Sequence, residues 1–202
     1  MINTGVDDVT RRWTLRLVVG LAAGAVLLSG CSEEQEASDT LPSAEASPSA
    51  SQAELPPLGP PDLPMPAEAR TQDAAGAEAF VRYYIDLINR TSTVMDAAPL
   101  REFSNRCAKC DRIATDAETD AAAGYSYQGG ELTVTTTGRP LMQGASAEVP
   151  FRADLAALTV VDKSGQPVPD LTFAAFPDLL SSAALSWSVD RDCWIITQLI
   201  LG

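Results

Sequence analysis

The spacing of apolar residues changes once along the second half of this chain, and that change constrains the fold more than any other feature. Between residues 74 and 124 apolar side chains recur every three or four positions, which predicts helices. Beyond Gly130 they alternate with polar residues, which predicts strands that bury one face. Helices followed by a run of strands are typical of an α+β domain, in which helices pack on an antiparallel sheet.

Three helices are expected before Gly124. The first covers residues 75–90, with Thr71 or Asp73 as its cap. Its buried face is predicted from residues at helical spacing, namely Phe80, Tyr84, Leu87 and Ile88. A short second helix is expected over residues 98–103. The third covers residues 110–124 and ends at Gly124, with small or aliphatic residues facing inward: Ile113, Ala114, Ala117 and Ala121.

The strands are expected in the alternating segments near residues 132–135, 145–152, 158–160, 171–173, 185–189 and 194–201. Polar and glycine-containing segments at 162–165 and 190–192 are typical of tight turns between them. We expect the strands to form an antiparallel meander, in which each strand pairs with the next one along the chain.

The helical part carries residues with a family resemblance. AEAFVRYYIDLINR at 77–90, PLREFS at 99–104 and the following CxxC resemble a family of uncharacterised lipoprotein domains from high-GC Gram-positive bacteria. The order of elements resembles the NTF2-like cone, in which a curved sheet wraps an amphipathic helix. The family of lipoprotein domains has no assigned activity, so the resemblance to it implies only architecture and cellular location. NTF2-like enzymes move protons with an Asp or His beside a Tyr, and Asp86 or Asp154 would imitate that acid.

The amino-terminal segment predicts export. Arg11, Arg12 and Arg16 precede an apolar run from Leu17 to Leu28. This run is too short to cross about 30 Å of hydrocarbon and fits a signal peptide. The segment around Arg11 also resembles a twin-arginine export motif, so export by the Sec or the twin-arginine route stays open.

The export segment ends in Leu28-Ser29-Gly30-Cys31, which is similar to the lipobox of bacterial lipoproteins. That resemblance implies a diacylglyceryl group on the Cys31 sulfur and cleavage just before Cys31. Two acyl chains give durable membrane attachment, whereas one gives marginal attachment. We therefore expect the mature protein on the outer face of the cell membrane, anchored at Cys31.

Three regions follow from these patterns: a signal peptide at 1–30, a lipidated disordered tether at 31–66 and an α+β domain at 67–202. The tether is rich in Ser, Glu and Pro and has almost no large apolar residue. Such a segment cannot bury enough apolar surface to offset its conformational entropy.

Three further cysteines are Cys107, Cys110 and Cys193. In an oxidising compartment a CxxC pair is expected to form a disulfide. On a regular helix residues three apart keep their Cβ atoms about 5–6 Å apart, but a disulfide needs about 4 Å. We therefore expect Cys107 and Cys110 in the first turn of a helix or just before it. Thiol–disulfide exchange is the alternative role. Cys193 is either a buried free thiol or a competitor for one of the two sulfurs.

Charge and composition exclude several functions. The net charge is −13, which argues against nucleic acid because phosphate binding needs a basic face. The chain has no His, so the commonest general base and the commonest zinc ligand are missing. We expect no catalytic residue, no metal site and no cofactor.

The sequence therefore favours a non-catalytic module that binds a small ligand or an unknown envelope protein. Phe80, Tyr84, Trp187 and Trp194 are expected in the core or, if the cone leaves a cavity, along its wall. A structural accessory subunit of a membrane-proximal assembly is the first alternative. A thiol–disulfide or acid/base enzyme is the second.

Overall fold

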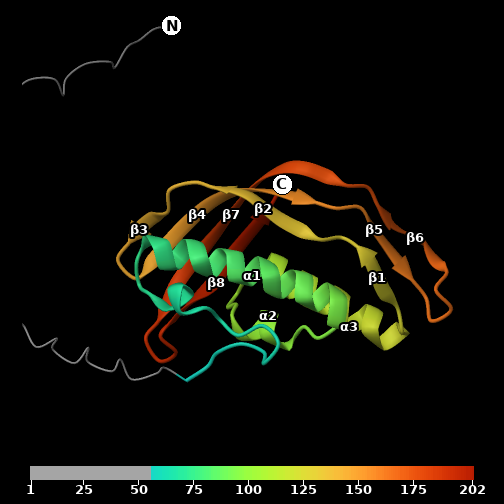
Figure 1. Cartoon of the computed structure of the whole chain (residues 1–202), viewed down its shortest axis with the longest axis horizontal. Helices are drawn as coiled ribbons and strands as arrows, with labels where there is room; N and C mark the ends of the chain where they lie inside the picture. Colours follow the sequence, from blue (N-terminus) through green and yellow to red (C-terminus); the bar gives the residue numbers. More distant parts are fainter. Residues whose placement is uncertain (1–55) are drawn as a thin grey trace, which may run out of the picture. The chain divides into compact units, whose positions relative to one another are not determined.

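Helices cover one face of an antiparallel sheet in the computed structural model, which describes residues 56–202 (Figure 1). The predicted α+β class is confirmed. The signal peptide, the lipidation site Cys31 and tether residues 32–55 lie outside the described residues. In chain order the elements are η1 (Ala67–Arg70), α1 (Ala74–Val94), α2 (Ala98–Glu102), α3 (Ala108–Ala123), β1 (Ser126–Gly129), β2 (Leu132–Thr137), β3 (Leu141–Gln143), β4 (Ser146–Leu155), β5 (Leu158–Val161), β6 (Pro167–Phe173), β7 (Phe176–Ser188) and β8 (Cys193–Leu201).

Helix α1 begins where the sequence predicts. The Asp73 carboxylate accepts a hydrogen bond from the Gly76 backbone N–H at 2.7 Å, which satisfies one of the free donors at the helix start. The helix ends at Met95, which adopts a left-handed backbone. The predicted inward face is confirmed, since all four of its residues are buried: Phe80, Tyr84, Leu87 and Ile88.

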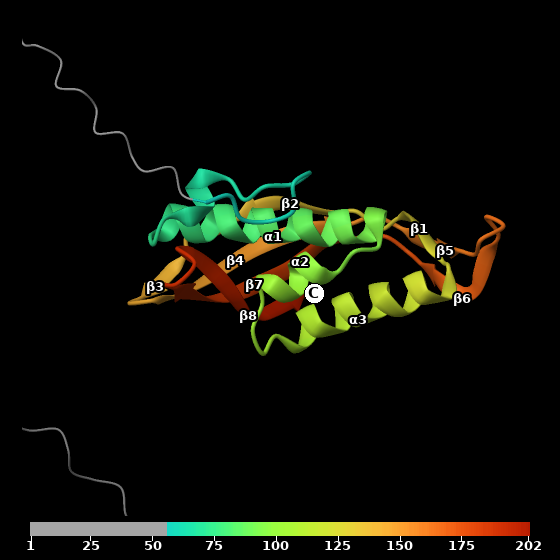
Figure 2. The same ribbon diagram turned by 90° about the horizontal axis from the view of Figure 1, so that it is seen from below.

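Helices α2 and α3 complete the helical layer, with α2 lying between the two longer helices (Figure 2). Helix α3 ends at Gly124, whose φ of 78° closes the helix as the sequence predicts. Ala114 and Ala117 are buried, as expected. Ile113 and Ala121 are only half-buried, because the inward face of α3 is narrower than predicted.

The strands do not form the predicted meander. The main sheet has the order β2-β4-β7-β8, with β3 paired to β4, and every pair is antiparallel. Strand β4 pairs with β7, and the β5–β6 hairpin between them in sequence joins β1 in a separate sheet. Alternation predicts which residues face the core, but it does not select the partner strand, which depends on long-range packing.

The separate sheet has the order β1-β5-β6 and lies at one end of the helical layer (Figure 1). Strands β1 and β3 were not expected, because they have four and three residues and show no clear alternation. Strand β6 is an edge strand of this sheet, and two of its residues, Pro167 and Pro169, have no backbone N–H to donate.

The predicted domain boundary at Pro66 is too late. Leu58 and Leu63 pack against the core, and Met65 is buried. The Arg70 guanidinium donates to the Pro56 carbonyl at 2.6 Å, and the Tyr83 hydroxyl donates to the Leu63 carbonyl at 3.3 Å. The proline-rich composition suggested a disordered tether, but these apolar side chains give residues 56–66 enough burial to fold onto the domain.

Among residues 56–202, no helix is both long and apolar enough to cross a bilayer.

Candidate ligand-binding groove beside helix α3

Of the four aromatic residues expected in the core or along a cavity wall, Phe80, Tyr84 and Trp194 lie in the core, and Trp187 is half-buried beside it. Phe80, Tyr84 and Trp194 have no exposed surface, and Trp187 packs edge-on against Trp194 with ring centroids 5.3 Å apart. The Trp194 indole donates to the Thr71 carbonyl at 3.0 Å, and the Tyr84 hydroxyl donates to the Leu100 carbonyl at 3.1 Å. The polar atoms of Trp194 and Tyr84 are therefore used in hydrogen bonds to backbone carbonyls. Burial raises the pKa of Tyr84 to about 12.

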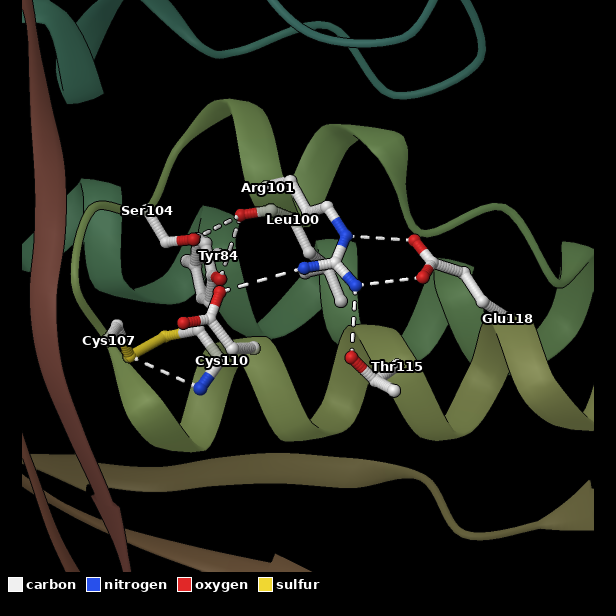
Figure 3. A network of polar contacts seen from close by, with 9 residues as sticks. Tyr84, Leu100, Arg101, Ser104, Cys107, Cys110, Thr115 and Glu118 are labelled. Carbon is white, nitrogen blue, oxygen red and sulfur yellow. Dashed lines mark hydrogen bonds and ion pairs between the residues drawn. A yellow bond between two sulfur atoms is a disulfide. The ribbon is translucent and has the colours of Figure 1, made fainter.

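The CxxC pair lies at the start of α3, as the sequence predicts. Cys107 is the residue before the helix and Cys110 is in its first turn. Their sulfurs lie at disulfide distance, 1.99 Å, and the Cys110 N–H points at the Cys107 sulfur at 3.2 Å (Figure 3). Both cysteines are buried, so the bridge constrains the first turn of α3 within the core.

Cys193 is a buried free thiol, the first of the two states considered for it. It lies at the start of β8 and has no exposed surface. Desolvation is the main cause that raises the pKa of this thiol, which keeps it in the unreactive protonated form.

Arg101 of α2 holds one face of α3 (Figure 3). Its guanidinium binds both carboxylate oxygens of Glu118 at 2.8 Å and donates to the Thr115 hydroxyl at 3.0 Å. It also lies 3.7 Å from the Asp111 carboxylate. The hydrogen bond from Arg101 lowers the pKa of Glu118. Two carboxylates of α3, Asp111 and Glu118, are therefore engaged by a single arginine.

Two further carboxylates of α3, Asp116 and Asp120, line a groove on another side of the helix. Helical geometry places Asp116 and Asp120 on the side of α3 away from Asp111 and Glu118, and Thr119 lines the groove with them. They form one wall of a hollow of about 360 Å³, and the strands of the small sheet form the other wall and the floor. We call this hollow the α3 groove; its sheet residues are Tyr127, Leu158, Val160, Leu171 and Phe173.

Tyr127 ties the two walls of the α3 groove together. Its hydroxyl donates to the Asp120 carboxylate at 2.6 Å. Burial is the main cause that raises the pKa of this phenol, and the hydrogen bond and charges of Asp120 and Asp116 add to it. The phenol therefore stays protonated. None of the ion pairs formed within residues 56–202 involves Asp116 or Asp120.

The floor of the α3 groove is apolar and open to solvent. Phe173 is 47% exposed, while Val160, another lining residue, is almost fully buried. Covering the exposed part of Phe173 with another apolar surface would be favourable, because it would remove that surface from water. The groove therefore combines an uncovered apolar floor with two carboxylates that no cation neutralises within residues 56–202.

Sequence reasoning did not identify this groove. No sequence motif marks Asp116 or Asp120 as part of a site, and Tyr127 lies in a strand that was not expected. The alternation of Leu171 and Phe173 was recognised as a strand, but nothing local indicated that this strand faces α3. The one available signal was the i, i+4 spacing of Asp116 and Asp120, which puts both on one helix face.

The acids considered for proton transfer do not meet a tyrosine among the described residues. Asp86 is exposed on α1, and desolvation raises its pKa. Arg90, one turn further along α1, forms its ion pairs with Asp62 at 2.8 Å and with Asp96 at 3.1 Å. Asp154 accepts a hydrogen bond from the Asp178 backbone N–H at 2.8 Å. Within residues 56–202 no three Cys, Asp or Glu side chains are grouped so as to hold a metal ion.

No family model and no curated protein matches this chain. The chain is similar to solved structures at low identity. One is the intermembrane-space region of the chloroplast protein ARC6, at 18% identity and TM-score 0.46, covering 65% of this chain and 97% of that one. Another is a nuclear transport factor 2 (NTF2-like) superfamily protein from Salmonella enterica serovar Typhimurium LT2, at 12% identity and TM-score 0.37, covering 64% and 92%. The α+β architecture itself rests on the elements described above.

Proposed function

We propose that this chain is an exported lipoprotein, anchored at Cys31 to the outer face of the cell membrane, whose folded domain is a non-catalytic binding module. The observation that carries the binding role is the α3 groove, because its apolar floor lies open beside Phe173. A membrane anchor and a folded domain with an uncovered groove together suit a protein that holds a ligand at the cell surface.

The anchor is supported by the sequence. Leu28-Ser29-Gly30-Cys31 follows a basic segment and a short apolar run, which is the pattern a lipoprotein signal peptide requires. The disulfide distance between Cys107 and Cys110 agrees with an oxidising compartment, where such pairs persist.

The anchor is tested by expressing the full chain in an actinobacterial host and labelling cells with a fatty-acid analogue. The wild-type chain should carry the label in the membrane fraction, and an inhibitor of the lipoprotein signal peptidase should cause the precursor to accumulate. Cys31→Ser is the matched control and should carry no label. Unlabelled wild-type protein with an amino terminus beyond Cys31 would overturn the anchor.

The groove is tested with a neutral aromatic probe, benzyl alcohol, in ligand-observed NMR titrations of the full chain held in discs of zwitterionic lipid. Phe173→Ser should weaken binding, because it removes the exposed aromatic of the floor. Leu180→Ser is the control, since Leu180 is 67% exposed on the main sheet and does not line the groove. Equal binding by wild type and Phe173→Ser would remove the groove as the binding site.

An accessory subunit role is the second candidate, favoured by one observation. Leu180 on β7 and Ile200 on β8 lie on the same face of the main sheet and are 67% and 44% exposed. Exposed aliphatic residues on a sheet face are suited to a protein partner. A photoreactive residue placed at position 180 would crosslink such a partner in cells. If the variant is anchored like the wild type and no crosslink forms, the binding module alone is favoured.

A further inference from the structure

We propose that the α3 groove takes a ligand in which a cationic ammonium group is joined to an apolar body. This inference rests on the binding role proposed above and names the chemical class of the ligand. Three features of the groove carry it: its apolar floor, its two carboxylates and its two aromatic rings.

The floor sets the apolar part of the ligand. Leu158, Val160 and Leu171 present aliphatic side chains from β5 and β6, and Phe173 extends this surface toward solvent. The hollow of about 360 Å³ is within the size range of small-molecule sites in proteins. A ring or short alkyl chain would cover the exposed part of Phe173, which is favourable because it removes apolar surface from water.

The helix wall sets the charge of the ligand. Of the acidic residues along α3, Arg101 engages Asp111 and Glu118 on the far face and leaves Asp116 and Asp120 facing the groove. Lys163 lies against Gly124, beyond the end of α3, and is not a lining residue of the groove. A cation would therefore meet two carboxylates of like sign, whereas an anion would be repelled by both.

The aromatic rings favour an ammonium over a metal ion as the cation. Tyr127 and Phe173 line the same groove as the two carboxylates, and aromatic faces attract ammonium groups. The Tyr127 hydroxyl is committed to Asp120, so this hydrogen bond fixes both the ring and the carboxylate in place. A preorganised acidic and aromatic wall binds an alkylammonium with little loss of conformational entropy.

The test compares three probes of similar size with the full chain in discs of zwitterionic lipid: benzyltrimethylammonium, benzyl alcohol and phenylacetate. Empty discs provide the blank for partitioning. We expect benzyltrimethylammonium to bind about fivefold more tightly than benzyl alcohol, and phenylacetate to bind most weakly. Raising the ionic strength should reduce the preference for the cation, because salt screens exposed charges.

Two isosteric variants test the carboxylates separately. Asp116→Asn and Asp120→Asn should each weaken benzyltrimethylammonium binding about twofold to fivefold, as expected for one partly exposed charge, and leave benzyl alcohol unchanged. Asn at position 120 keeps an oxygen that can accept the Tyr127 hydrogen bond. Asp190→Asn is the matched control, since Asp190 is exposed in the β7–β8 turn and forms no ion pair within residues 56–202.

The outcomes separate this inference from the binding role itself. If Phe173→Ser weakens all probes while neither Asn variant affects the cation, the groove binds ligands but the ammonium assignment is wrong. Equal affinity of wild type for benzyltrimethylammonium and benzyl alcohol also overturns the assignment. If no probe responds to Phe173→Ser, the proposed binding site fails and the ligand class fails with it.

Discussion

Reduction of the Cys107–Cys110 disulfide should destabilise the domain only modestly. The two cysteines are three residues apart, so the bridge closes a loop of about four residues. In the chain-entropy account a loop of that size contributes about 1.9 kcal/mol at 25 °C, compared with about 4.7 kcal/mol for a loop of about 100 residues. For a domain of this size the corresponding fall in Tm is about 4–8 °C.

The small effect follows from how much else holds α3 in place. Ala114 and Ala117 are buried against the rest of the domain, and Arg101 binds Glu118 on the outer face. These contacts persist when the disulfide is reduced, so α3 should remain folded. The bridge adds to a packed helix and is not its only support.

The measurement is thermal unfolding by circular dichroism, with and without a phosphine reductant, and thiol titration to confirm reduction. The Cys107→Ala/Cys110→Ala variant is the control, because its Tm should not respond to reductant. Complete unfolding on reduction, or a loss above about 4 kcal/mol, would show that the loop-entropy reasoning is wrong. An unchanged Tm in fully reduced protein would also refute the loop-entropy reasoning, because it would show that the bridge contributes no stability.

Three further predictions concern the same domain. Asn89→Ala should lower the free energy of unfolding, measured in urea, by about 2 kcal/mol, because the Asn89 amide both donates to and accepts from the Leu132 backbone at 2.9 Å. A change near zero would mean that water replaces both hydrogen bonds. Asp73→Ala should cost about 1 kcal/mol at pH 7. The Gly76 N–H is the main cause that lowers the pKa of Asp73 below 3.8, so this contribution is complete above pH 3.8 and is lost as the pH falls through the folded-state value. A difference between wild type and variant that does not shrink as the pH falls below 3.8 would contradict this account. Met65→Ala should lower the free energy of unfolding by about 2 kcal/mol in the same assay, since Met65 is only 8% exposed. An unchanged unfolding midpoint would mean that residues 56–66 belong to the tether and not to the folded domain.

Features that depend on a few neighbouring residues were predictable. The Asp73 cap and the buried face of α1 follow from helical spacing, and the position of the cysteine pair follows from the separation of Cβ atoms on a helix. Gly124 ends α3 because a residue without a Cβ adopts the left-handed backbone easily. In each case the residues that decide the outcome lie within about one turn of each other.

Features that depend on distant residues were not predictable. The pairing of β4 with β7 joins Ala147 to Leu185, far apart in sequence, and no local pattern selects that partner. Residues 56–66 read as a tether because their few apolar side chains find their partners only in the folded core. The α3 groove belongs to the same class, since it forms only when β6 is brought opposite Asp116.

The two prolines of β6 also bear on how many molecules can associate. A neighbouring chain can pair with an unpaired edge strand and extend the sheet by backbone hydrogen bonding. Pro167 and Pro169 remove two of the donors that such growth would require, and Asp170 between the turn and Phe173 has a left-handed backbone that interrupts a regular ladder. Copies of this domain should therefore resist fibre formation through the β6 edge. Phe173 can thus remain exposed on this strand without promoting aggregation.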